Sequence, residues 1–201
     1  VKLIVTGVSA CRELFQRAAE SGAGMVIVHH GLFWTGDSPV VKGVLKERLA
    51  VLIENDISLL AYHLPLDRHP RIGNNAVGAE KLGMKNREEF SGIGFQGDLG
   101  GTSIEELTGR VKEIYGSDPL VFSEGPETIR RAAICSGSAP KKISEAIELG
   151  LDAYITGEVS EPVMNLAREG KIHYIAAGHY ATERLGIGAL GDLIRDRFDV
   201  E

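Results

Sequence analysis

Six side chains of metal-binding type follow apolar, strand-like runs of the sequence. They are His29, His30, His63, Asp67, His179 and Glu183, from "VIVHHG", "AYHLPLD" and "AGHYATE". Ligand sites gather at the carboxyl ends of strands in open α/β sheets. In two of these runs an acid follows the histidine by four residues, which places both side chains on one side of a helical turn. A lone histidine at a strand end is more often structural, but three such clusters together favour a metal site.

The residue types indicate which metals would bind. Imidazoles and carboxylates with no cysteine nearby suit divalent zinc, iron, manganese or nickel better than calcium or a structural zinc site. Six groups are more than one open catalytic ion needs, whereas two ions about 3.5–4 Å apart would use all of them. Asp67 and Glu183 are candidates to bridge the ions, because a carboxylate has two oxygens to share. A metal-bound water would then be the nucleophile, and no side chain is assigned that role.

The adjacent pair His29 and His30 poses a geometric problem. Neighbouring side chains in a continuing strand point to opposite faces of the sheet. Gly31 follows the pair and can leave β space more readily than any other residue. We therefore expect the strand to break after "HH", so that both rings reach one site.

A second set of polar residues lies near these clusters in the sequence. Its members are candidates to orient a ligand or to contact the substrate, and they are Asn74, Asn75, Thr156, Glu158 and Arg184. Glu158 could equally be a solvated acid at the start of a helix, and Arg184 a solvated surface residue. His69 and His173 lack comparable neighbours and are expected at the surface or behind the ligands.

The elements that must position these residues alternate between strand and helix. Residues 2–10, 24–31, 57–63 and 119–125 have the pattern of strands, and residues 11–23, 44–56 and 105–116 that of helices. Such alternation predicts an α/β fold with a parallel or mixed sheet.

The second half of the chain resembles the first. Residues 131–158 have the same strand, helix, glycine, strand order as residues 3–30, and a shift of 116 places His63 and Asp67 on His179 and Glu183. We therefore predict one domain over residues 1–201, built as two similar α/β lobes related by a pseudo-twofold, with the metal site between them. Lobe one would span about 1–90, a connecting region 91–126, and lobe two 127–201.

Composition excludes several classes of function. The net charge is -6 without a basic stripe, so nucleic acid is not expected as a partner. Two cysteines and no run of about 20 apolar residues predict a cytoplasmic protein that binds no membrane. "GIGFQG" and "GIGALG" match a dinucleotide motif, but neither follows a strand and opens a helix. "CSGSAPK" has the pattern of a strand-to-helix turn with capping serines.

The longer motifs resemble a known family. "VTGVSA", "VIVHHGLFW", "AYHLPLDRHPRIGNNA", "ITGEVSE" and "AAGHYATERLGIGAL" are similar to the YbgI-like members of the Nif-three-like family, often called GTP cyclohydrolase 1 type 2 homologues. The resemblance implies a two-lobed α/β fold with a dinuclear metal site, assembled as a toroidal homohexamer. Its motifs place the metal ligands at the same six residues.

Two main functions fit this sequence. The first is a metal-dependent hydrolase that acts on a small nucleotide-like or heterocyclic substrate. The alternative is a metal-handling or scaffold protein without catalytic activity; a partner-binding adaptor has only the family name in its favour. Open coordination positions beside Trp34, Tyr62 and Tyr180 would favour the enzyme, and a closed, fully liganded site would favour storage.

Overall fold

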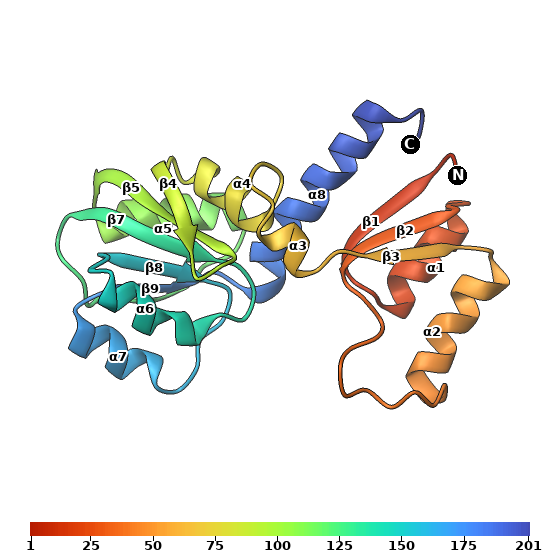
Figure 1. The fold of residues 1–201 in the computed structure, drawn as a ribbon, viewed down its shortest axis with the longest axis horizontal. Coiled ribbons are helices and arrows are strands. Elements are labelled where there is room, and N and C mark those ends of the chain that lie inside the picture. Colours follow the sequence, from red (N-terminus) through yellow and green to blue (C-terminus); the bar gives the residue numbers. More distant parts are fainter. The chain divides into compact units, whose positions relative to one another are not determined.

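The protein contains two β-sheets, which belong to two compact units. The computed structural model describes residues 1–201 (Figure 1). One unit comprises residues 1–66 and 187–201, and the other comprises residues 67–186. The α/β class expected from the sequence is confirmed, with a three-stranded parallel sheet in the first unit and a six-stranded mixed sheet in the second.

The first unit is a parallel sheet with the strand order β1-β2-β3. Its elements are β1 (Ile4–Ser9), α1 (Arg12–Glu20), β2 (Met25–His30), α2 (Gly43–Glu54) and β3 (Ser58–Ala61). Apolar side chains of α1 and α2 pack on one face of the sheet, where Phe15 and Leu52 meet Val26 and Val28. Val26 and Val28 are two residues apart, so they point to the same face.

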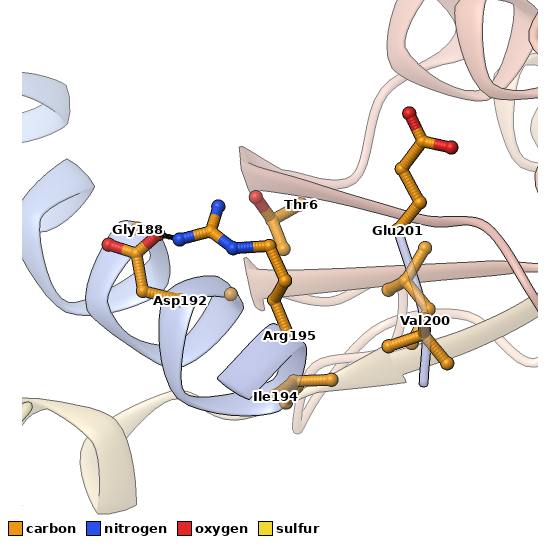
Figure 2. Close-up of a pocket in the computed structure, with 9 residues that line it drawn as sticks. Thr6, Gly188, Asp192, Ile194, Arg195, Val200 and Glu201 are labelled. Atoms are coloured by element: carbon orange, nitrogen blue, oxygen red, sulfur yellow. Dashed lines mark hydrogen bonds and ion pairs between the residues drawn. The ribbon is translucent and has the colours of Figure 1, made fainter. Parts of the chain in front are cut away.

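The end of the chain lies along β1 in the same unit. The Ile4 N–H donates to the Glu201 carbonyl at 2.7 Å, and the Glu201 N–H donates to the Lys2 carbonyl at 2.8 Å. A cavity of about 310 Å³ lies here; it is lined by Ile4, Thr6, Gly188, Gly191, Asp192, Ile194, Arg195, Val200 and Glu201 (Figure 2). None of the candidate metal ligands lines this cavity.

The second unit contains a six-stranded sheet with the order β4-β5-β7-β8-β9-β6. Its strands are β4 (Lys85–Phe90), β5 (Gly94–Thr102), β6 (Leu120–Phe122), β7 (Ile129–Cys135), β8 (Ala153–Thr156) and β9 (His173–Ala176). Strands β7, β8 and β9 are parallel, and the other pairs are antiparallel.

The remaining helices follow in the chain after β3. They are α3 (Leu64–Asp67), α4 (Asn74–Lys81), α5 (Ile104–Tyr115), a 3-10 turn η1 (Pro140–Lys142), α6 (Ile143–Glu148), α7 (Val163–Gly170) and α8 (His179–Arg197). The boundary between the units falls within α3 and again within α8.

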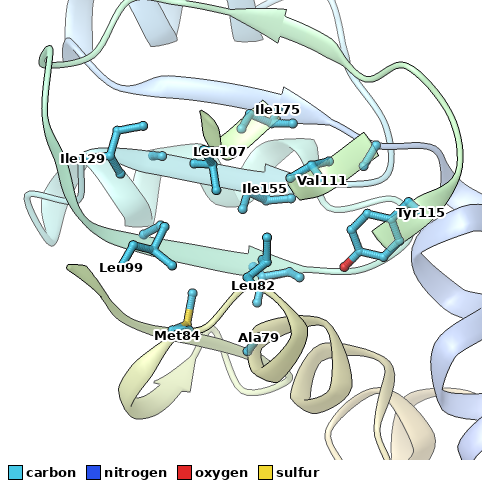
Figure 3. Close-up of a cluster of buried hydrophobic side chains, with 14 residues drawn as sticks. Ala79, Leu82, Met84, Leu99, Leu107, Val111, Tyr115, Ile129, Ile155 and Ile175 are labelled. Carbon is cyan, nitrogen blue, oxygen red and sulfur yellow. The ribbon is translucent and has the colours of Figure 1, made fainter. Parts of the chain in front are cut away.

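Two apolar clusters cover the two faces of the six-stranded sheet. Ile134, Ile155 and Ile175 belong to one cluster, together with residues of α4 and α5 (Figure 3). Tyr154 and Tyr174, each one residue away along its strand, belong to the other. Because successive side chains alternate between faces, the central strands are buried on both sides.

The helices and strands expected from the sequence are present, but the β4–β5 hairpin was not predicted. β4 reads "KNREEF" and five of its six residues are exposed, so it lacks the alternation of a half-buried strand. Charged side chains are typical of an edge strand, the position that β4 occupies.

Neither glycine motif opens a helix after a strand, as expected. Residues 92–97 run from a turn into β5, and residues 186–191 lie inside α8. The longest helix, α8, also lacks the sustained apolar stretch that crossing a bilayer requires, and so do the other helices.

The boundaries of the compact units differ from those expected for the lobes. Residues 67–90 belong with the six-stranded sheet, and residues 187–201 belong with the three-stranded sheet. Both units nevertheless contain a strand-helix-strand-helix-strand segment with parallel pairing, β1 to β3 and β7 to β9. The internal duplication remains a prediction that this correspondence supports.

Candidate metal centre

Three histidines converge at the carboxyl end of the first sheet. His29 and His30 end β2, and His63 follows β3. Their ring centroids are 4.7 Å apart for His29 and His30, 5.0 Å for His29 and His63, and 5.2 Å for His30 and His63. One ring nitrogen of each lies within 4.8 Å of the others. A cluster of this kind can hold a metal ion.

The adjacent histidines converge because the strand stops at His30. Gly31 lies outside β2, and a Cβ atom there would come within 2.9 Å of the Ala61 Cβ on the neighbouring strand. That spacing is tighter than side chains tolerate, so Gly31 permits the close approach of the two strand ends.

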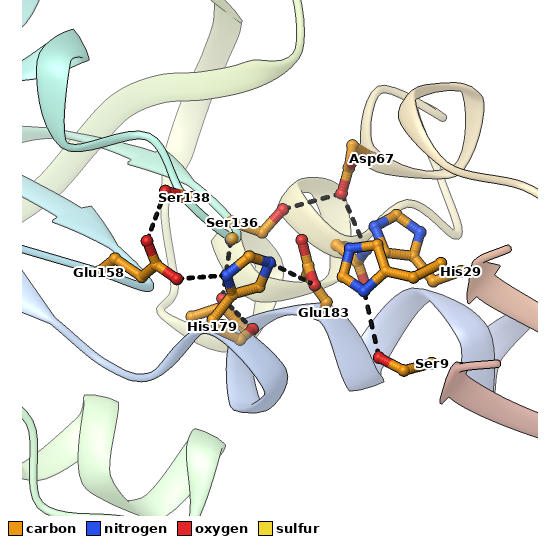
Figure 4. Close-up of polar contacts among 12 residues, drawn as sticks. Ser9, His29, Asp67, Ser136, Ser138, Glu158, His179 and Glu183 are labelled. Carbon is orange, nitrogen blue, oxygen red and sulfur yellow. Dashed lines mark hydrogen bonds and ion pairs between the residues drawn. The ribbon is translucent and has the colours of Figure 1, made fainter. Parts of the chain in front are cut away.

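Hydrogen bonds orient two of these rings. The His29 Nδ1 lies 2.9 Å from the Tyr62 carbonyl oxygen, which can only accept, so Nδ1 carries the proton and the lone pair is on Nε2. The His30 Nδ1 lies 3.3 Å from the Ser9 hydroxyl at the end of β1 (Figure 4). Ser9, which was not predicted from the sequence, therefore supports a candidate ligand.

In the second unit, Asp67 is held by a buried network of polar groups. The Asp67 Oδ1 accepts from the Ser136 hydroxyl and from the Asn74 amide, both at 2.9 Å (Figure 4). The Asn75 amide donates to the Asp67 carbonyl, and its own oxygen accepts from the Ser136 N–H at 2.7 Å. Asn74 and Asn75 are fully buried, and the structure brings both to Asp67.

His179 lies between two carboxylates in the same unit. Its Nδ1 donates to the Glu158 Oε1 at 2.6 Å, and its Nε2 lies 3.1 Å from the Glu183 Oε2 (Figure 4). His179 and Glu183 are four residues apart in α8 and share one face of it. With a proton on Nδ1, the Nε2 atom can face a carboxylate oxygen only if it carries a proton or binds a cation. This arrangement fits a metal ligand.

Glu158 is charged in this setting. The hydrogen bond from the Ser138 hydroxyl, and then the one from His179, hold the pKa of the Glu158 carboxyl below its ordinary value, against the opposing effect of partial burial. A carboxylate at Nδ1 fixes the tautomer and the orientation of a metal-binding histidine.

The loop after β7 contacts each part of this second group. Ser136 binds Asp67, Ser138 binds Glu158, and a Cβ atom on Gly137 would overlap the Glu183 carboxylate. Gly137 also has a φ of 67°, a left-handed conformation that favours glycine. The loop can approach Glu183 closely only because residue 137 has no side chain.

Two threonines complete the setting of this loop. The Thr156 hydroxyl donates to the Gly137 carbonyl at 3.3 Å, and the Thr182 hydroxyl accepts from the Gly137 N–H at 3.0 Å.

The expectation that the serines of "CSGSAPK" cap a helix is wrong. η1 has Ala139 at its N-cap and no side-chain cap, whereas Ser136 and Ser138 bind carboxylates.

The candidate Arg184 and the two histidines that were not selected as ligands lie in different settings. Arg184 donates to the Tyr115 carbonyl at 2.9 Å, where it caps the end of α5. The His69 ring accepts from the Arg71 and Ile72 N–H groups. His173 was expected at the surface or behind the ligands, but it is 3% exposed and bonds through its ring nitrogens to Gly125 and Pro126 at 3.2 and 2.9 Å, which indicates a structural role.

Comparison with known protein families covers the whole chain. The profile of the Duf34/NIF3 (NGG1p interacting factor 3) family matches residues 1–201. The chain belongs to this family. The resemblance read from the motifs is thereby confirmed.

Members of the Duf34/NIF3 family from two bacteria illustrate the similarity. Proteins of Pseudomonas aeruginosa and Escherichia coli K12, both named GTP cyclohydrolase 1 type 2 homolog, are 45% and 44% identical to this chain. The alignments cover 100% of this chain and 82% of each relative.

Solved structures show the same fold. The protein ybgI, described as of unknown function, matches with a TM-score of 0.96 and 43% identity over 100% of this chain and 82% of its own. TTHA1606 from Thermus thermophilus matches with a TM-score of 0.91 and 32% identity, covering 100% and 81%. The three chains thus share one fold.

Proposed function

We propose that this Duf34/NIF3 protein is a metal-dependent hydrolase with a dinuclear centre. The proposed ligands are the six residues His29, His30, His63, Asp67, His179 and Glu183. The observation that carries the proposal is the convergence of three imidazole nitrogens within 4.8 Å, because neutral imidazoles are preferred ligands of divalent transition ions. Zinc, iron, manganese and nickel all suit this donor set.

The second unit supports the proposal through the way its acids are held. Asp67 is fixed by Ser136 and Asn74, and Glu183 lies 3.1 Å from the His179 Nε2. Hydrogen-bonded ligands of this kind lose little conformational freedom when an ion binds. We therefore assign Asp67, His179 and Glu183 as ligands, with Asp67 and Glu183 able to bridge two ions.

The supporting residues keep donor atoms in the state that a cation requires. Glu158 accepts the Nδ1 proton of His179, and the Tyr62 carbonyl accepts that of His29, so each ring presents Nε2 as the acceptor. Bound divalent ions would lower the pKa of a water molecule toward neutrality and would polarise the group under attack.

The proposed substrate is a small nucleotide-like or heterocyclic molecule. The two bacterial relatives are named GTP cyclohydrolase 1 type 2 homolog, which favours a nucleotide-like substrate. The chain is acidic and lacks the basic stripe that binding to a nucleic acid requires, so a small molecule is favoured over a polymer. We further propose a cytoplasmic homo-oligomer, with six chains as the family resemblance implies. Light scattering should then give a mass near six times 21.6 kDa.

A substrate screen tests the hydrolase. Metal-loaded protein is incubated with GTP, other nucleotides, heterocycles and generic phosphate esters, with His30→Ala as the control. Metal-dependent turnover that is lost in His30→Ala supports the proposal. The same turnover in both proteins belongs to a contaminant, and bound metal without turnover favours the metal-handling alternative.

A further inference from the structure

Trp34 lies beside the three histidines of the first unit, on the loop that follows β2. The Trp34 N–H donates to the Asp37 carboxylate at 3.1 Å, and the Asp37 N–H donates back to the Trp34 carbonyl at 3.1 Å. The indole Nε1 donates to the Gly31 carbonyl at 3.2 Å. The ring is therefore held by its own loop, and its one polar atom has a partner there. What the ring offers to a ligand is its apolar face.

The position of the ring relative to the histidines leaves that face available. Its centroid lies 5.0 Å from that of His63 with the planes at 86°, and 5.9 Å from that of His30 with the planes at 55°. Neither imidazole is stacked face to face on the indole. Trp34 is 44% exposed, whereas the rings of Tyr154 and Tyr174 in the second unit are fully buried.

A large aromatic side chain in this position is better suited to binding than to packing. Ligand sites combine aromatic walls with a few convergent polar groups, and here the polar groups are the candidate metal ligands. Rings interact favourably with centroids about 4.5–7 Å apart, which matches the distances from the indole to His30 and His63. A molecule bound at these imidazoles would therefore lie within reach of the indole.

We infer that Trp34 is a specificity-determining residue that stacks on a planar heteroaromatic ring of the substrate. The inference rests on the proposed function, because it is the metal centre that brings the substrate to His30 and His63. Stacking on an aromatic side chain tolerates any base, since every base has a π face. A phosphate group or an aliphatic chain has none. The site would thus distinguish heteroaromatic substrates from simple phosphate esters.

Trp34 is the only tryptophan of the chain, so its fluorescence reports on this ring alone. The protein is loaded with Zn²⁺ and titrated separately with guanosine, uridine and inorganic phosphate, with calorimetry for affinity and emission excited at 295 nm. We expect both nucleosides to bind and to change the emission. Trp34→Ala should weaken nucleoside binding by about tenfold or more, and Trp34→Phe should restore most of the affinity.

Phe33→Ala is the matched control, because it removes an exposed aromatic ring from the same loop. It should bind nucleosides as the unaltered protein does. Equal nucleoside affinity in Trp34→Ala and the unaltered protein would overturn the inference, and so would failure of both nucleosides to bind. An emission change that depends on protein concentration and not on added nucleoside would also overturn the inference, because Trp34 would then contact a second copy of the chain. Zn²⁺ content measured in the same samples separates this result from failure of the metal centre.

Discussion

Strands β1–β3 and strands β7–β9 form two parallel strand sets with the same order of elements. The two sets place different residues at the end of the middle strand. β2, the middle strand of the first set, ends in His29 and His30, two candidate ligands. β8, the middle strand of the second set, is followed by Glu158, which binds the Nδ1 of His179. The last strands are alike, since each is followed by a histidine with an acid four residues on. The end of β2 thus carries two candidate metal ligands, whereas the end of β8 carries a carboxylate that orients the candidate ligand His179.

The helices that follow the last strands also differ. α3 contains four residues, whereas α8 contains nineteen. A short helix provides little support for its last residue, and Asp67 is held by side chains from outside it, Ser136 and Asn74. Glu183 lies within a long helix and packs against Gly137. The spacing of histidine and acid is shared, while the means of holding the acid depends on local structure.

Loss of a ligand from either set should have the largest effect. His63→Ala and His179→Ala should each lower metal affinity by more than about 100-fold, because a direct bond is lost rather than a supporting one. Competition with a chelator of known affinity measures this.

His69→Ala is the control, because the His69 ring binds N–H groups of its own loop. It should retain metal affinity. Equal losses in all three variants would indicate general destabilisation rather than ligation, and a loss in only one of the ligand variants would break the correspondence between the strand sets.

Gly137→Ala tests the loop after β7, which contacts Asp67, Glu158 and Glu183. The new Cβ would overlap the Glu183 carboxylate and would take a left-handed conformation. We expect metal affinity to fall, together with a loss of unfolding free energy above the roughly 1–2 kcal/mol that the conformation alone costs. Chemical denaturation and metal titration measure the two effects.

Gly22→Ala supplies the matched control. Gly22 has a φ of 76°, and a Cβ atom there meets nothing within 4 Å. This variant should lose only the conformational contribution and should bind metal normally. If the two variants behave alike, contact between residue 137 and Glu183 has no functional importance.

Glu158→Gln probes the supporting carboxylate. The amide keeps the size of the side chain but loses its charge, so metal affinity should fall by about 10- to 100-fold. Ser138→Ala removes one hydrogen bond to the same carboxylate and should have a smaller effect. A larger loss in Glu158→Gln than in His179→Ala would contradict the assigned roles.

The cysteines give the smallest expected effect. Cys135 at the end of β7 is fully buried, and burial raises the pKa of its thiol to about 12, whereas Cys11 in the first unit is half-buried. A thiol that is protonated at pH 8 reacts slowly. Iodoacetamide should therefore label Cys11 and leave Cys135 unmodified in the folded protein, as mass spectrometry can show. Prompt labelling of both residues would mean that the unit containing the six-stranded sheet opens readily.

The candidate ligands could be selected from the sequence because their types and spacing are unusual. Histidine at the end of an apolar run, followed by an acid at i+4, combines two local patterns. Asn74 and Asn75 were also found, because they closely follow Asp67. By contrast, Ser9 and Ser136 were missed, since serine after a strand is common in turns and caps and its long-range partner leaves no local pattern.

Other errors have the same origin. His173 was misplaced because its burial depends on Gly125 and Pro126, which are more than forty residues away in the chain. β4 was missed because an edge strand can be almost entirely charged. Long-range hydrogen bonds and strand pairing, rather than local pattern, determine these features.

The central claim is that the six residues of the two sets hold two divalent ions. Untagged protein stripped of metal and titrated with Zn²⁺ in a calorimeter tests it most directly. We predict a stoichiometry of two ions per chain, reduced in both His63→Ala and His179→Ala. Absence of specific Zn²⁺ uptake, or one ion per chain that persists in either variant, would contradict a dinuclear centre formed from both strand sets.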